Sequence, residues 1–317
     1  MNNVVSTGPD PSVLAEVLDG LRQPQKTLSP KFFYDARGSE LFEQITRLEE
    51  YYPTRTEVGI LTEHGPALGR AIGPDAVVVE FGAGNLEKIR LLLDVLEKPR
   101  AYVPIDISAE HMTDAAAVLD REYPGLLVEP VAGDYTKPLA LPEWAMESGV
   151  HRVGFFPGST IGNFHPDEAA AFLANIRDIL GGGDLVIGID LEKDPEVLNL
   201  AYDDPAGVTA AFNLNMLNNL NNLVGADFDL DKFQHRAFYN TSLNRIEMHL
   251  VSREAQYVTI GGEVIAFAEG ETIHTECSYK YSPERIQALA AAGGWRVRHS
   301  LYDERRWFSL HYFEADK

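Results

Sequence analysis

Residues 77–90 read VVVEFGAGNLEKIR and decide the fold. The run VVVEF predicts a buried strand, and the segment from Leu86 onward has apolar residues at helical spacing. Gly82 and Gly84 lie between the two. A strand that ends in Glu-x-Gly-x-Gly and leads into a helix is typical of turns that hold nucleotide cofactors, because glycine lets the backbone pass close to the ligand. Glu87 replaces the third glycine of the dinucleotide fingerprint, which favours a cofactor without a pyrophosphate.

The composition bounds the kind of protein. A chain of 317 residues is long enough for one large domain or two smaller ones. It carries 27 Lys and Arg against 48 Asp and Glu, a net charge of −21, and no basic cluster stands out. Since nucleic acids are bound by clustered Lys and Arg, we expect no nucleic-acid partner and instead a small-molecule substrate. The sequence implies no obligate protein partner.

Compartment and metal content follow from a few residue types. The single cysteine, Cys277, excludes an internal disulfide, and the nine histidines lack metal-ligand spacing, so we predict no metal. The first residues lack the basic and apolar parts of a signal peptide, and no apolar run reaches membrane-spanning length. We therefore expect a cytoplasmic protein without a membrane contact.

Strands and helices alternate over the middle of the chain. Short apolar runs that predict strands recur at 76–81, 101–106, 126–132, 152–157 and 184–191. Helical patterns separate most of them, and the pattern at 167–180 has Pro166 before it and Gly181-Gly182-Gly183 after it. This alternation predicts an α/β fold with a parallel, Rossmann-like sheet covered on both faces.

The flanking segments predict a second, α+β domain. Helices are expected at 12–22, 39–50 and 54–68, the last with a capping box formed by Thr54 and Glu57. Residues 196–223 are helical and rich in Asn, and we interpret the Asn residues as a solvated face. Strands are expected at 245–252, 256–260, 263–268 and 272–279, with a Gly261-Gly262 hairpin turn. A helix at 282–292 and strands at 295–301 and 306–314 are expected to return to the first sheet.

These patterns predict two discontinuous domains. Residues 1–57 and 196–283 form one, and residues 58–195 and 284–317 form the other. In open α/β sheets, ligands bind at the carboxyl ends of the strands, where the strand order reverses. Four features are expected at that edge: the glycine turn, Asp106, Asp134 and the loop 158–163. Each has an ordinary alternative, such as a strand-to-helix turn or a turn acid, but their joint placement favours cofactor binding.

The motifs resemble one family of enzymes. Glu80-Phe81-Gly82-Ala83-Gly84 with Asp106 resembles the class I methyltransferases. The segments that resemble the histidine-specific Nα-methyltransferases of ergothioneine biosynthesis more closely are KFFYD (31–35), YYPTRTE (51–57), GSTIGN (158–163), YDD (202–204), IEM (246–248) and ECS (276–278). This resemblance covers residues 25–315. It implies a class I methyltransferase sheet with a second α+β substrate domain.

The resemblance implies a reaction and a set of site residues. The reaction is the transfer of three methyl groups from S-adenosyl-L-methionine (SAM) to the α-amino group of L-histidine, through mono- and dimethyl intermediates, to give hercynine, the first step of ergothioneine biosynthesis. The implied cofactor-binding residues are Gly82, Lys88, Asp106, Asp134 and Tyr135. The implied substrate-binding residues are Tyr51, Asn163, Tyr202, Met248, Glu276 and Ser278, and the implied catalytic residues are Tyr34 and Asn163.

Roles within this set follow the same resemblance. Lys88 is expected to meet the methionyl carboxylate, Asn163 the α-amino group, and Tyr51 with Tyr202 the substrate carboxylate. Glu276 and Ser278, two apart on a strand, could grip the two imidazole nitrogens. Without the resemblance, the residues alone would equally fit a surface lysine, core tyrosines, a core methionine and a solvated strand face.

Tyr34 is the candidate proton acceptor or relay, but a phenol with a pKa near 10 is a weak base at neutral pH, so water could take the proton instead.

The nearest alternative function is the same reaction on another amino acid such as tryptophan, which the polar pair Glu276 and Ser278 disfavours. A nicotinamide-dependent oxidoreductase and a non-catalytic cofactor-binding regulator are the alternatives from other classes.

Overall fold

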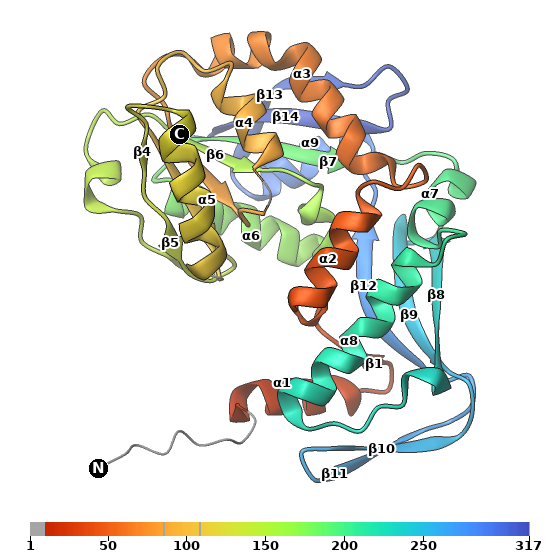
Figure 1. The fold of residues 1–317 in the computed structure, drawn as a ribbon. Coiled ribbons are helices and arrows are strands. Elements are labelled where there is room, and N and C mark those ends of the chain that lie inside the picture. Colours follow the sequence, from red (N-terminus) through yellow and green to blue (C-terminus); the bar gives the residue numbers. More distant parts are fainter. Residues whose placement is uncertain (1–9, 85, 108, 317) are drawn as a thin grey trace, which may run out of the picture. The chain divides into compact units, whose positions relative to one another are not determined.

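The computed structural model describes residues 10–84, 86–107 and 109–316 (Figure 1). The chain separates into two units. The small-sheet unit comprises the chain up to Tyr52 together with Lys193–Ser278, and the large-sheet unit comprises Pro53–Glu192 together with the chain from Tyr279 onward. The domain ends expected from the sequence lie three to five residues later (57 against 52, 195 against 192 and 283 against 278).

The large-sheet unit is built on an 8-stranded sheet with the order β13-β14-β7-β6-β2-β3-β4, in which β5 also pairs with β3. Its strands are β2 (Val77–Phe81), β3 (Ala101–Asp106), β4 (Leu127–Val128), β5 (Val131–Ala132), β6 (Arg152–Phe156), β7 (Asp184–Asp190), β13 (Trp295–Tyr302) and β14 (Phe308–Ala315). The strands from β2 to β7 pair in parallel, whereas β14 is antiparallel to both of its neighbours, β7 and β13.

The strand series confirms the predicted α/β sheet and the return of the last two strands to it. One prediction was wrong: residues 126–132 form two short strands rather than one. Pro130 lies between them and has no N–H for the ladder, so pairing with β3 is interrupted there.

Helices cover both faces of this sheet (Figure 1). They are α3 (Tyr52–Ile72), α4 (Glu87–Leu93), α5 (Ala109–Glu122), α6 (Pro166–Ile179) and α9 (Pro283–Ala292), with short 3-10 turns η2 (Glu143–Met146) and η3 (Thr160–Asn163). On one face, buried residues of α3, α4 and α5 share a core with Val78 and Tyr102. On the other, Phe156 of β6 packs against Phe172 of α6, with ring centroids 5.0 Å apart.

The small-sheet unit contains a 4-stranded sheet, a hairpin and four helices of the described chain. The sheet has the order β1-β12-β9-β8, and β10 pairs with β11. The bounds are β1 (Lys26–Thr27), β8 (Phe233–Asn240), β9 (Arg245–Ser252), β10 (Gln256–Ile260), β11 (Glu263–Phe267), β12 (Thr272–Tyr279), α1 (Pro11–Leu21), α2 (Ala36–Ile45), α7 (Pro195–Tyr202) and α8 (Val208–Val224), with 3-10 turns η1 (Pro30–Phe33) and η4 (Leu230–Lys232). The predicted Gly-Gly hairpin is confirmed, whereas β8 was not predicted.

Two predicted helices need correction. The helical stretch 196–223 is two helices, because the chain turns after Tyr202 and Asp204 accepts hydrogen bonds from the N–H groups of Val208 (2.9 Å) and Thr209 (2.7 Å) at the start of α8. The predicted capping box is absent, because α3 already begins at Tyr52 and Glu57 lies buried within it.

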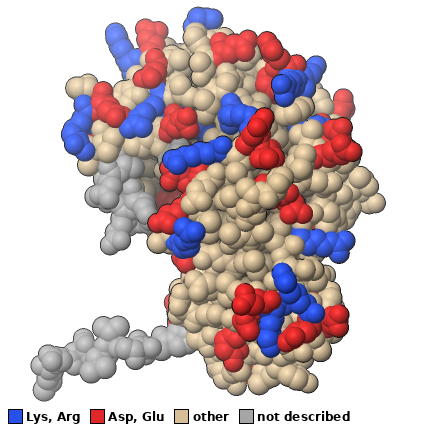
Figure 2. All heavy atoms as spheres, turned by 45° about the vertical axis from the view of Figure 1, so that its right-hand side comes forward, with Lys and Arg blue, Asp and Glu red and all other residues tan. Residues whose placement is uncertain are grey.

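Surface features agree with the composition. On the face that Figure 2 shows, Lys and Arg side chains lie beside Asp and Glu side chains, and most of the surface between them is uncharged. Among the described residues, no helix combines the length and the apolar character needed to cross a membrane.

Candidate active site

Three predicted cofactor-binding residues follow neighbouring strands of the large sheet. Gly82 directly follows β2, Asp106 ends β3, and Asp134 comes two residues after β5. Hydrogen bonds join these turns: the Gly82 N–H donates to Ile105 O (2.9 Å), and the Gly133 N–H donates to Asp106 O (3.0 Å). Strand order reverses at β2, which lies between β6 and β3. The turns therefore lie together at the edge where such sheets bind ligands.

The turn after β2 requires glycine. Gly82 has φ +77°, a conformation that L side chains rarely adopt, and a Cβ at this position would lie 3.0 Å from the Tyr135 hydroxyl oxygen. Burial raises the pKa of Tyr135 to about 12, so its hydroxyl stays neutral. A backbone without a side chain at Gly82 and the neutral aromatic ring of Tyr135 beside it fit an adenosyl cofactor.

Asp134 is engaged in a turn. It accepts hydrogen bonds from the Thr136 N–H (3.0 Å) and the Thr136 hydroxyl (2.5 Å), and it pairs with Lys137 at 2.9 Å. Burial acts to raise the pKa of Asp134, but these hydrogen bonds outweigh it and hold that pKa below its usual value. The carboxylate is therefore ionised at neutral pH, and the turn-acid role considered from the sequence is present in the structure.

Lys88 is not a solvated surface lysine. Its Nζ lies 2.5 Å from Oε2 of Glu57, and the two side chains are 13% and 0% exposed. Both Glu57 oxygens accept from the Gly158 N–H, at 3.1 and 2.9 Å. Glycine at 188 makes room for this carboxylate, because a Cβ there would lie 1.9 Å from it. The sequence predicted a capping role for Glu57 and missed its pairing with Lys88, for which the only signal was its place at the end of the YYPTRTE segment.

A second buried carboxylate lies at the end of β2. Glu80 is 3% exposed and accepts a hydrogen bond from the Tyr102 hydroxyl. Burial raises the pKa of Glu80 to about 7, although the Tyr102 hydrogen bond and the charge of Lys88 act to lower it. The side chain therefore titrates near neutral pH, in contrast to Asp134.

Asn163 ends η3 in a loop whose backbone is held firmly. Gly158 and Ser159 both have positive φ, +83° and +58°. The Ser159 hydroxyl accepts from the Asp190 N–H (2.8 Å), and the Asp190 carboxylate forms a buried ion pair with Lys280 at 2.7 Å. With the Glu57 contacts, these bonds fix the start of the loop that carries Asn163.

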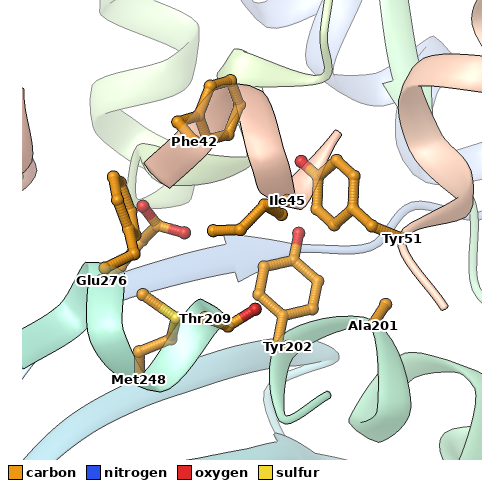
Figure 3. A pocket seen from close by; sticks show the side chains of 9 residues that line it. Phe42, Ile45, Tyr51, Ala201, Tyr202, Thr209, Met248 and Glu276 are labelled. Carbon is orange, nitrogen blue, oxygen red and sulfur yellow. The ribbon is translucent and has the colours of Figure 1, made fainter. Parts of the chain in front are cut away.

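The small-sheet unit contains a pocket of its own (Figure 3). Its lining residues are Phe42, Ile45, Tyr51, Ala201, Tyr202, Thr209, Phe212, Met248 and Glu276. The mostly apolar lining with a few polar groups fits a small, polar ligand.

Four of the six residues implied for substrate binding line this pocket: Tyr51, Tyr202, Met248 and Glu276. Figure 3 shows the hydroxyl groups of Tyr51 and Tyr202 on the same side of the pocket, and their ring centroids are 6.1 Å apart. Ser278 is 3% exposed and accepts a hydrogen bond from the Tyr202 hydroxyl at 3.0 Å. The sixth residue, Asn163, belongs to the other unit.

Tyr34 lies beside this pocket rather than in its lining. Its side chain is 50% exposed, and its ring contacts those of Phe42 and Phe212 edge-on, each at a centroid distance of 5.8 Å. Phe42 and Phe212 both line the pocket. Sequence reasoning missed the pocket residues Thr209 and Phe212, which carry no motif and are brought in by the first turns of α8.

One group of described side chains could hold a metal ion, although the sequence predicted none. Donor atoms of Glu247, His249 and His274 lie within 4.8 Å of one another. Arg245 pairs with the Glu247 carboxylate at 2.7 Å, and burial, the largest effect on each, lowers the pKa of both histidines. A cation beside Arg245 would be repelled, so we interpret the group as a hydrogen-bonded cluster around the Arg245–Glu247 ion pair on β9 and β12.

The strand order, with its antiparallel strand β14 beside β7, and the glycine turn at the carboxyl end of β2 fit the class I SAM-dependent methyltransferase fold that the sequence motifs predicted. The sequence pattern of one family, described as histidine-specific methyltransferase, SAM-dependent, matches residues 13–315. The chain therefore belongs to the SAM-dependent histidine-specific methyltransferases, and SAM is its methyl donor.

Individual relatives agree with this membership. The chain is 44% identical to the histidine N-alpha-methyltransferase of Mycolicibacterium smegmatis, over 93% of this chain and 92% of that protein. It is 43% identical to the protein of the same name from Mycobacterium tuberculosis, over 89% of each. It is also 33% identical to ergothioneine biosynthesis protein 1 of Neurospora crassa, over 87% of this chain and 31% of that longer protein.

Proposed function

We propose that this enzyme trimethylates the α-amino group of L-histidine to hercynine, the first step of ergothioneine biosynthesis, in the cytoplasm. The observation that carries the proposal is the small-sheet pocket, in which one carboxylate and two phenol groups are set in an apolar lining. Membership of a histidine-specific family and the names of the relatives support the same substrate.

The small-sheet unit is proposed to select histidine. Glu276 accepts a hydrogen bond from one imidazole nitrogen, and the Ser278 hydroxyl forms a hydrogen bond with the other. Tyr51 and Tyr202 donate to the substrate carboxylate, for which the Tyr202 hydroxyl turns its single proton from Ser278 to the substrate. Met248 packs against the ring. A site that hydrogen-bonds the ring of its substrate rejects analogues that lack the partner, because the polar groups are then left unsatisfied.

The large-sheet unit is proposed to hold SAM. Lys88 binds the methionyl carboxylate, Asp106 the ribose hydroxyls, and Asp134 with Tyr135 the adenine, while Gly82 leaves the backbone open to the ligand. SAM supplies an electrophilic methyl group on its sulfonium. The requirement for glycine opposite Tyr135 and the buried cation at Lys88 support this assignment.

Positioning and proton removal complete the proposed mechanism. The amine must lose its proton before it can attack, and its lone pair must be aligned with the methyl group, so orientation accounts for much of the rate. Asn163 orients the amine. Tyr34 accepts or relays the proton, with water as the final acceptor, because a phenol with an ordinary pKa of about 10 is a weak base.

The test is mass spectrometry of purified protein incubated with SAM and each of the twenty amino acids. The proposal predicts a gain of three methyl groups on histidine alone. A gain on tryptophan or another amino acid would overturn the assigned roles of Glu276 and Ser278. No gain on any amino acid would overturn the proposed substrate class.

A further inference from the structure

The sequence suggested that the Asn residues of helix α8 form a solvated face. In the structure, only some of them are exposed. Asn213, Asn215 and Asn219 are buried, 0%, 7% and 7% exposed, whereas Asn218 and Asn222 on the same helix are exposed. Asn is mildly unfavourable inside helices because its side chain competes for backbone hydrogen bonds. Buried amides on one face of such a helix therefore have specific partners to satisfy.

Two of these amides reach the same short segment of the chain. The Asn215 side chain donates to Oδ1 of Asp35 at 2.7 Å, and the Asn219 side chain donates to the backbone oxygen of Phe32 at 2.8 Å. Residues four apart lie above one another on a helix, so the two donors act from adjacent turns. Tyr34 lies between the two residues that they hold.

The same helix also packs against this segment. The Phe212 ring stacks on that of Phe33 at 4.5 Å and meets the Tyr34 ring edge-on at 5.8 Å. Asp35 Oδ1, the atom that Asn215 binds, also accepts from the Gly38 N–H at 2.6 Å and so caps α2. The backbone on either side of Tyr34 is therefore fastened by hydrogen bonds, while its half-exposed side chain projects beside the pocket.

We propose that Asn215 and Asn219 are positioning residues that set the location of the Tyr34 hydroxyl for proton transfer from the substrate amine. The inference rests on the function proposed above, in which Tyr34 accepts or relays that proton. Neither amide reaches the pocket lining, so each acts through the 32–35 segment rather than on the substrate. Asn215 and Asn219 thus act on proton transfer from the substrate and not on cofactor binding.

The experiment compares two pairs of substitutions on one helix. Asn215→Ala with Asn219→Ala removes the donors to the 32–35 segment, and Asn218→Ala with Asn222→Ala changes two exposed amides of α8 as the matched control. We expect the first pair to lower kcat/KM for histidine by about ten- to a hundredfold, since small displacements of a reacting group have effects of this size. The control pair is expected to keep wild-type turnover, and both are expected to keep wild-type affinity for S-adenosylhomocysteine.

A double-mutant cycle with Tyr34→Phe separates positioning from a purely structural role. If the amides act through the Tyr34 hydroxyl, the Asn215 and Asn219 substitutions lower kcat/KM by less than about twofold in the Tyr34→Phe background. A structural role would give the same loss in both backgrounds. Thermal unfolding monitors the fold, and Asn215→Ser with Asn219→Ser, which keep a hydroxyl donor, replace the alanines if those variants do not fold.

Each outcome bears on the inference. Loss in the wild-type background together with its absence in the Tyr34→Phe background supports it. No loss, or an equal loss in both backgrounds, overturns it. If wild-type protein methylates histidine and only the coupling is absent, the positioning role fails while the proposed function stands. If wild-type protein does not methylate histidine, it is the proposed function that fails.

Discussion

The candidate residues of the two units are brought together in different ways. Gly82, Asp106 and Asp134 each follow a strand of one parallel sheet, and their order in the chain matches the order of those strands in the sheet. Tyr51, Tyr202 and Glu276 come instead from the turn before α3, the end of α7 and strand β12, which are far apart in the sequence. One set is placed by sheet topology and the other by packing between distant segments.

This difference teaches what each half of the enzyme depends on. Parallel strands that end at one edge place their following turns together whatever the side chains, so a cofactor site can be located from strand order. A pocket lined by distant elements depends on the packing of many side chains, as the contacts of α8 with η1, α2 and β9 illustrate. Substitutions in the two units should therefore affect different steps.

The largest expected effect is on substrate recognition. Glu276→Ala should lower kcat/KM for histidine by up to about 1,000-fold, because the imidazole N–H would lose a charged acceptor and stay unpaired. Steady-state kinetics measure this loss, and calorimetry should show unchanged affinity for S-adenosylhomocysteine. Glu263→Ala, on the exposed side of the hairpin in the same unit, is the control. An equal loss of cofactor affinity would break the proposed separation of roles.

The next effect is a pH dependence of stability that resides in the large-sheet unit. Burial raises the pKa of Glu80 from 4.5 to about 7, so its stabilising contribution is complete below pH 4.5 and is lost as pH rises through 7. Relative to Glu80→Gln, the wild type should lose about 3 kcal/mol in the free energy of unfolding over that range. Urea unfolding at pH 5 and pH 8 tests this, with Glu87→Gln as the exposed control. A constant difference between wild type and Glu80→Gln would contradict it.

A smaller effect is expected on cofactor affinity. Lys88→Met removes the buried cation near the glycine turn and should weaken binding of S-adenosylhomocysteine by about ten- to a hundredfold, the range for a hydrogen bond to a charged group. Calorimetry measures the dissociation constant, and Lys98→Met, exposed after the same helix, is the control. Unchanged affinity in Lys88→Met would remove Lys88 from the cofactor site.

The smallest effect concerns the start of α8. Asp204→Ala should lower the free energy of unfolding by about 1 kcal/mol, because the N–H groups of Val208 and Thr209 lose their acceptor. Urea unfolding measures the change. Asp203→Ala is the control, since the Asp203 side chain is 58% exposed. Equal free energies of unfolding for the two variants would show that the Asp204 cap stabilises the protein no more than the exposed Asp203 does.

The sequence predicts the large-sheet unit better than the small-sheet unit. The strands β2, β3 and β7 are mostly apolar and almost wholly buried, so their apolar runs located them almost to the residue. Strand β8 alternates irregularly between polar and apolar residues and was missed. The Gly82 turn could be read from local rules, whereas Tyr51, Tyr202 and Glu276 could be selected only through the family resemblance.

Buried polar side chains were the hardest to foresee. Glu57, Asn215 and Asn219 look like surface residues in the sequence, because each is a polar residue within a helical pattern. Their burial depends on partners far along the chain, Gly158 for Glu57 and the 32–35 segment for the two amides. No local pattern encodes such pairings, so only the tertiary structure reveals them.

The measurement that tests the central claim most directly follows the label from methyl-deuterated SAM to L-histidine in the presence of the purified enzyme. Fragmentation of the product by tandem mass spectrometry locates each labelled methyl group. The account predicts three labelled groups, all on the α-nitrogen, and none on the imidazole. Label on a ring nitrogen, or no labelled histidine at all, would contradict it.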